Sequence, residues 1–162
     1  MIIVYKNMQQ IKFLSAKERQ EIIEKLKNQF GIENVNGEFI LSGTDRIFLY
    51  QGSLKQEEIT QIQKRTIIER IGIYFAKKIN DEIKLSLDGV QISREKIKKN
   101  IFEINKKQAD DWMSGKELLI ETGLRGFMIL KYENNFLGCG KASEGKITNF
   151  VTKSRRLKYK EN

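Results

Sequence analysis

The residues best suited to chemistry form a basic run near the C-terminal end of the chain. Lys153, Arg155 and Arg156 stand close together in KSRRLKYK, a run opposed only by Glu161. Guanidinium groups contact phosphate oxygens in forked pairs, and an aromatic side chain such as Tyr159 can stack on an unpaired base. Basic tails are often merely solvated, so this run alone does not decide between a polyanion partner and solvent.

The residues before the run favour a nucleic-acid partner. Asn149 and Phe150 directly precede it, and Lys141 and Lys146 flank the turn before them. Cations supply affinity for phosphates, whereas amides and aromatic rings contact bases. We therefore expect one RNA-binding surface to include these positions.

Gly138-Cys139-Gly140-Lys141 resembles a phosphate loop only superficially. That loop requires a glycine five positions before the Gly-Lys pair and Ser or Thr after it, but Asn135 and Ala142 stand there. A nucleophilic Cys139 would need a positioned acid, base or cofactor site. The chain has no histidine and no Gly-rich cofactor loop after a strand. We expect Cys139 to be a small apolar core thiol.

The acidic pairs do not favour catalysis or metal binding. Glu57-Glu58, Asp81-Glu82 and Asp110-Asp111 are adjacent in sequence, and adjacent residues on a helix or strand face different directions. Without histidine the chain also lacks His-based triads and His metal ligands. The sequence therefore predicts no enzyme activity, no metal site and no cofactor.

Composition supports a polyanion partner. The 162 residues carry a net charge of +9 and the pI is about 9.6. Residues 1–97 hold 16 Lys and Arg against 13 Asp and Glu, whereas residues 98–162 hold 14 against 8, so the excess is concentrated in the C-terminal part. The chain has one cysteine, no apolar run long enough to span a membrane and no signal-like N-terminus. These features predict a cytoplasmic protein that does not contact membranes.

The N-terminal part is expected to mix helices and strands. Ser15 and Glu18 fit a capping box for a helix that buries its apolar face and closes at Gly31. Residues 1–14 are expected to be extended or partly disordered. Short strands are expected at 37–43, 46–50, within 67–78 and at 83–87, the last ended by Asp88-Gly89, and a second capping box at Ser53 predicts a helix with Ile59 and Ile62 inward.

A polar, basic connector at 93–100 predicts a domain boundary, giving domains 1–97 and 98–162. Beyond it, Asn105 can cap a short helix that carries Trp112, which is expected to be core, and Gly115 is expected to close that helix. Strands are expected at 126–132, 136–142 and 146–151.

A set of segments in the C-terminal part carries a resemblance to a known family. These segments are ADDWMSG at 109–115, GFMIL at 126–130, FLGCGK at 136–141, GKITNF at 145–150 and KSRR at 153–156. In this order and spacing they resemble the RNA-binding PUA-like domain at the C-terminus of some ribosomal-RNA cytosine-5 methyltransferases of the Nol/Nop/Sun class. They are also similar to short stand-alone archaeal ribosome-biogenesis proteins of that group.

Two departures accompany this resemblance. The family often has proline before the lysine at 153, and this chain has Thr152. The methyltransferase domain is missing, because residues 1–97 are too short for it and lack its Gly-rich loop. Those residues look instead like the small α/β domain that precedes PUA modules in Nip-type ribosome-assembly proteins.

Together these observations predict an α+β protein, with a small α/β N-terminal domain followed by a C-terminal PUA-like β-barrel. The resemblance implies non-catalytic binding of structured RNA, ribosomal or transfer RNA, in ribosome biogenesis or RNA modification. The alternative is an adaptor that docks on an RNA methyltransferase or assembly factor, and a stripped RNA-modifying enzyme is a third interpretation. The candidate RNA-binding residues are Gly115, Lys141, Lys146, Asn149, Lys153, Arg155 and Arg156, with Gly115 expected to seat a strand by close backbone approach.

Overall fold

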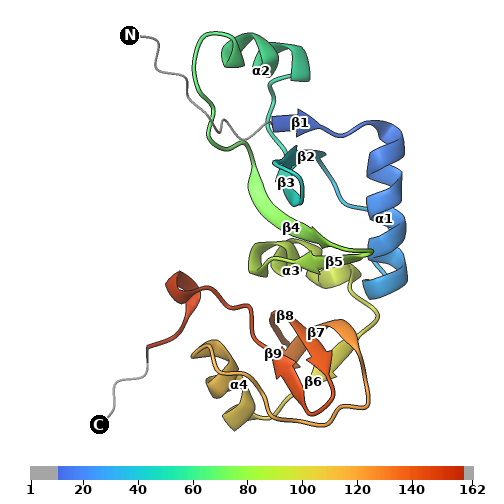
Figure 1. Ribbon diagram of the computed structural model, residues 1–162, viewed down its shortest axis with the longest axis vertical. Coiled ribbons are helices and arrows are strands. Elements are labelled where there is room, and N and C mark those ends of the chain that lie inside the picture. Colours follow the sequence, from blue (N-terminus) through green and yellow to red (C-terminus); the bar gives the residue numbers. More distant parts are fainter. Residues whose placement is uncertain (1–10, 159–162) are drawn as a thin grey trace.

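The computed structural model describes residues 11–158, which fold into two sheets with helices around them (Figure 1). The first sheet is antiparallel in the order β1-β2-β3-β4-β5. Its strands are β1 (Ile11–Phe13), β2 (Glu38–Ser42), β3 (Arg46–Tyr50), β4 (Ile73–Ile79) and β5 (Glu82–Leu85). The expectation of extended chain near the N-terminus is met at β1, while residues 1–10 lie outside the described range.

The second sheet has the order β6-β7-β8-β9, with β6 parallel to β7 and the other pairs antiparallel. Its strands are β6 (Ile101–Glu103), β7 (Gly126–Tyr132), β8 (Asn135–Ser143) and β9 (Lys146–Thr148). The α+β class is therefore confirmed. The expected barrel is not closed, because the four-stranded ladder stays open within residues 11–158 and only Leu118 extends it, by a bridge to Ile147.

The helices are α1 (Ala16–Phe30), α2 (Gln56–Gln63), α3 (Leu87–Ser93) and α4 (Lys106–Met113), with single 3₁₀ turns at Arg94–Lys96 and Lys153–Arg155. The capping box of α1 is confirmed, because Ser15 Oγ accepts from the Glu18 amide and Glu18 accepts from the Ser15 amide. Gly31 closes this helix at φ 75°, as expected. None of these helices is long and apolar enough to cross a membrane.

The larger core lies between α1 and the first sheet. Ile22, Leu26 and Phe30 on the inner face of α1 pack with apolar strand residues such as Phe39 and Phe75. This cluster continues into the second sheet through Phe127, Ile129 and Cys139. The two sheets thus share apolar contacts, and the division of the chain at residues 97 and 98 stays a prediction.

A second core surrounds Trp112, whose side chain is fully buried and whose Nε1 donates to the Leu137 carbonyl at 2.9 Å. Gly140 makes this packing possible, because a Cβ there would lie 2.7 Å from the Trp112 ring and 2.6 Å from Ile147. The expectation that Trp112 belongs to the core is confirmed. The α4 cap at Asn105 is confirmed as well.

Two expectations for the N-terminal part were wrong. Asp88 and Gly89 do not form a turn that ends the strand, because they belong to the first turn of α3. Ser86 Oγ accepts from the Gly89 amide and caps this helix. Likewise, α2 begins after Lys55, whose amide donates to Glu58, and not at Ser53.

The remaining differences concern boundaries and orientation. Ile62 of α2 does not point inward, being 38% exposed, whereas Ile59 is buried as expected. The sequence contained no clear signal for the three-residue strand β6, and β9 ends at Thr148 instead of continuing to residue 151. Short strands depend on their partners, which local sequence does not reveal.

Candidate nucleic-acid interface

The basic segment 153–158 is fixed to the fold at several points. Arg155 Nη2 lies 3.0 Å from both carboxylate oxygens of Asp88 on α3, and the Leu157 amide donates to the Met113 carbonyl at the end of α4. Lys153 is exposed and has no ion-pair partner within residues 11–158. The structure therefore brings Lys153 and Arg155 to one 3₁₀ turn, with Arg155 reaching back toward α3.

Arg156 and Gly115 are brought together directly. Arg156 Nε donates to the Val151 carbonyl at 3.1 Å, and the same atom would lie 2.3 Å from a Cβ added at Gly115. Gly115 also has φ 96°, a conformation that favours glycine. The close approach expected at Gly115 exists, but it accommodates the Arg156 side chain and does not seat a strand.

Asn149 has its polar atoms engaged inside the protein. Its Nδ2 donates to the carbonyls of Trp112 and Lys116, both at 2.8 Å, and its Oδ1 accepts from the Val151 amide at 2.7 Å. These bonds tie the segment after β9 to the end of α4. Asn149 thus positions the basic segment, and a contact between Asn149 and a base stays a prediction.

Lys141 and Lys146 point to different acidic partners. Lys141 Nζ lies 3.4 Å from Glu82 on β5 and 4.9 Å from the centroid of the Phe127 ring. Lys146 Nζ lies 2.9 Å from Glu117. Exposed pairs of this kind contribute little to stability, so both ammonium groups can exchange a carboxylate for a phosphate.

A second group of cations lies on the first sheet. The strand register pairs Arg46 on β3 with Lys77 on β4, and Lys77 with Lys84 on β5. Cross-strand partners share a face of the sheet, so these three cations form a row. A β-bulge between Ile47 and Phe48 shifts the pairing register of β3 and β4 by one residue. Tyr74 therefore pairs with Phe48 and lies on the same face as the row.

Aromatic rings continue from this face to the second sheet. The Phe48 and Tyr74 centroids are 5.5 Å apart, and Lys84 Nζ lies 4.3 Å from the centroid of Phe150. Phe150 in turn lies 6.1 Å from Phe127. Lys84 and Lys141 thus lie over two neighbouring aromatic rings, Phe150 and Phe127, across the junction between the sheets.

Phe48, Tyr74, Lys84 and Phe150 border a groove of about 570 Å³ at that junction. It is bounded by the open face of β3, β4 and β5 on one side and by the segment from Phe150 to Arg155 on the other. Among the described residues its basic lining residues are Arg46, Arg70, Lys77, Lys84 and Arg155, and its acidic lining residue is Asp88. The groove therefore has the charge and the rings that a nucleic acid requires.

Burial and repulsion act on the cations of this groove. Burial lowers the pKa of Lys84, and the charge of Lys77 lowers that pKa further. Burial also raises the pKa of the Tyr74 hydroxyl. Lys77 has an acidic neighbour, Asp45 at 3.1 Å, but neither Arg46 nor Lys84 forms an ion pair with any described residue. An anion entering the groove would therefore meet Arg46 and Lys84 as cations without an ion-pair partner among the described residues.

The sequence interpretation missed these sheet residues. A partial signal existed, because Lys84 alternates with the buried Ile83 and Leu85 and thus had to face away from them. The row itself depends on the pairing of three strands, of which β3 and β4 are far apart in sequence, and the bulge decides which rings share its face.

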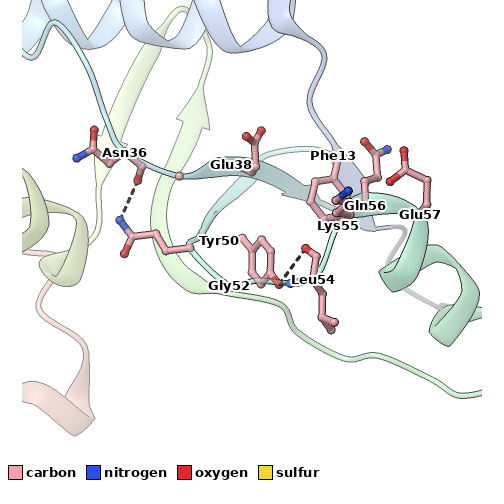
Figure 2. A pocket seen from close by; sticks show the side chains of 11 residues that line it. Phe13, Asn36, Glu38, Tyr50, Gly52, Leu54, Lys55, Gln56 and Glu57 are labelled. Carbon is pink, nitrogen blue, oxygen red and sulfur yellow. Dashed lines mark hydrogen bonds between the residues drawn. The ribbon is translucent and has the colours of Figure 1, made fainter.

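A second hollow, of about 670 Å³, lies at the end of the first sheet near α2 (Figure 2). Its rim includes Tyr50, whose hydroxyl donates to the Leu54 carbonyl at 3.2 Å and accepts from the Leu54 amide at 3.1 Å. Its charged lining residues are Glu38, Lys55 and Glu57, and Figure 2 shows the two carboxylates apart from each other. Two acidic side chains against one basic side chain do not favour phosphate binding. The two carboxylates also do not converge as an acid–base pair would.

Cys139 lies within the core, 5% exposed, and burial raises the pKa of its thiol to about 12. A thiolate nucleophile requires a lowered pKa, and the expectation that Cys139 is a small apolar core thiol is confirmed by its burial. Among the described residues no group of three His, Cys, Asp or Glu side chains is placed to hold a metal ion.

Comparison with known proteins bears on the C-terminal part of the chain. No curated protein matches the chain. Residues 99–157 match the family model described as the methyltransferase RsmF PUA domain, about a third of the chain. The match begins just before β6 and ends within the basic segment, and a PUA domain suggests RNA binding. This chain is therefore a PUA-domain protein whose C-terminal region resembles the PUA domain of RsmF-type methyltransferases.

Proposed function

We propose that this protein binds structured RNA, ribosomal or transfer RNA, through its PUA domain and catalyses no reaction itself. The observation that carries the proposal is the position of segment 153–158, which lies at the end of the region matching the PUA model and is fixed there through Arg155 and Arg156. Phosphate contacts from this segment would supply affinity, and RNA shape would supply most of the selectivity.

The proposed setting is the cytoplasm, in ribosome biogenesis or RNA modification. Lys141 and Lys146 would extend the phosphate contacts along β8 and β9 by exchanging their glutamate partners for RNA. Gly115 would contribute by leaving room for Arg156, and Asn149 by holding the segment in place.

The test is RNA binding across a salt series, with total ribosomal RNA and transfer RNA as probes. The wild type is compared with a Lys153→Ala, Arg155→Ala, Arg156→Ala triple variant. Each lost phosphate contact lowers the slope of log affinity against log salt by about one unit, so we expect the variant to bind more weakly with a slope reduced by up to about three. A matched control removes the same charge from the α1 and α2 region, as Lys17→Ala, Lys27→Ala, Lys64→Ala.

Absence of binding at low salt would reject the RNA proposal. Equal loss in the triple variant and its control would assign the effect to net charge and not to the segment. Because Arg156 also donates to Val151, the melting temperature of each variant is measured, and Lys153→Ala with Arg155→Ala serves as a variant that keeps this bond.

A second candidate is an adaptor that docks on an RNA methyltransferase or assembly factor. It is favoured by exposed apolar side chains around α2 and the start of β4, namely Leu54, Ile62, Ile67 and Ile73. Exposed apolar groups in one region favour protein contacts. This candidate would lead if the protein failed to bind RNA at low salt.

A further inference from the structure

We infer that the groove between the two sheets holds a single-stranded RNA segment, so that the N-terminal sheet and the PUA domain form one interface. The ligand would be one or two unpaired nucleotides, with a base against Tyr74 or Phe150 and phosphates at Arg46, Arg70 and Lys84. This inference rests on the proposed function, because the segment would continue from RNA held by the PUA domain.

The charge arrangement is the first argument. Arg46, Lys77 and Lys84 are direct cross-strand neighbours, and like charges in such positions destabilise a sheet. Asp45 forms an ion pair with Lys77 at 3.1 Å, whereas Arg46 and Lys84 form none with the described residues. A row with more cations than acidic partners is suited to an anion that arrives from outside.

The aromatic rings are the second argument, because they distinguish single strands from duplex. Phe150 is 37% exposed, and Tyr74 lies half-buried on Phe48 in the same groove. Bases stack on such rings only when they are unpaired. Lys84 Nζ now lies over the Phe150 ring at 4.3 Å, so an entering base can replace it there while the ammonium turns to a phosphate.

Continuity with the PUA domain is the third argument. Arg155 belongs to segment 153–158 and also lines the groove, where Asp88 holds it. A strand that leaves the segment therefore reaches the groove at Arg155, beside its partner Asp88. The volume of about 570 Å³ suits one or two nucleotides.

The test uses a hairpin RNA in blunt form and with a single-stranded extension of about six nucleotides at either end, a length within the usual site sizes for single strands. A 2-aminopurine base in the extension reports stacking through its fluorescence. The wild type is compared with an Arg46→Gln, Lys84→Met double variant and with Tyr74→Leu. A Lys17→Gln, Lys27→Gln variant removes equal charge from α1.

We expect the extension to raise wild-type affinity about tenfold and to quench 2-aminopurine. In the double variant the gain should disappear and the salt slope should fall by about 1.4, since two single-strand phosphate contacts are lost. Blunt-hairpin binding and the melting temperature should persist. An extension that adds nothing, or a gain that survives both groove variants, would overturn the inference while leaving PUA-domain binding intact.

Failure of the proposed function has a different signature. Blunt hairpins would then not bind. A free six-nucleotide oligonucleotide would still bind in a way that depends on Arg46 and Lys84, which would support the single-strand site in the groove without the proposed PUA-domain binding. An oligoglutamate peptide is the competing probe. Tighter binding of this peptide than of the oligonucleotide, lost in the double variant, would overturn the inference and make the groove a site for acidic proteins.

Discussion

The two basic regions of this protein assemble their cations in opposite ways. In segment 153–158 the cations are neighbours in sequence but separate in space, because Arg155 reaches Asp88 while Arg156 lies against Gly115. On the first sheet, Arg46, Lys77 and Lys84 are distant in sequence but adjacent across strands. A basic run thus identifies a region of the chain, whereas strand register decides which cations can share one anion.

The two regions also differ in how firmly each cation is held. The sheet cations project from strands that belong to the larger core, so their backbone is fixed by the fold. The Asn149 side chain and the Leu157 amide tie segment 153–158 to the end of α4, and Arg156 donates to the Val151 carbonyl. Breaking those bonds should loosen the segment and spare the sheet.

The largest expected effect comes from Asn149→Ala. The substitution removes three hydrogen bonds and leaves the Trp112 carbonyl and the Val151 amide without this partner. We expect the free energy of unfolding to fall by about 2–3 kcal/mol, measured by urea denaturation. RNA affinity should fall as well, since segment 153–158 loses its position. Unchanged stability with weaker binding would instead indicate that Asn149 contacts RNA directly.

Gly115→Ala should have the next largest effect. It strains a residue at φ 96° and displaces Arg156, which its Cβ would otherwise meet at 2.3 Å. We expect a loss of about 1–2 kcal/mol in the free energy of unfolding and a modest loss of RNA affinity. Gly123→Ala is the matched control, because Gly123 has φ 68° with open space around its Cβ position. If both variants bind RNA equally, Arg156 does not contribute to binding.

The sequence predicted one region far better than the other. Helix α1 followed from local signals, because Ser15, Glu18 and Gly31 specify both of its ends. The basic segment was visible as a run of charges. The sheet row was not, since Arg46 pairs with Lys77 across strands far apart in sequence. The bulge at Ile47 and Phe48 also places Tyr74 and Lys77, three positions apart, on one face, which local alternation does not predict. Helix α3 was missed because Asp88-Gly89 also fits a turn.

Asp88→Asn should strengthen RNA binding. The carboxylate of Asp88 is the only acidic group that residues 11–158 contribute to the groove lining, and it holds Arg155 at 3.0 Å. Its neutralisation frees Arg155 and removes repulsion against phosphate, so we expect affinity to rise about two- to fivefold at low salt with a slope steeper by about one unit. Glu95→Gln, on an exposed residue outside the groove, is the control. Weaker binding by Asp88→Asn would show that Asp88 orients Arg155 for RNA.

The smallest expected effect concerns Cys139, which reports whether the two regions separate. The thiol lies in the core shared by the two sheets, and burial raises its pKa to about 12. In the unfolded chain it loses its proton near pH 9, so its contribution to stability is complete below that pH and is lost as pH rises from 9 toward 12.

We therefore expect Cys139 to resist alkylation at pH 8 until the whole protein unfolds, and Cys139→Ala to lose less stability than wild type above pH 9. Titration of lysines and tyrosines is common to both proteins, so their difference isolates the thiol. Alkylation in conditions that leave the first sheet folded would show that the sheets open independently. The groove would then form only when both regions are closed, and RNA would protect Cys139 from the reagent.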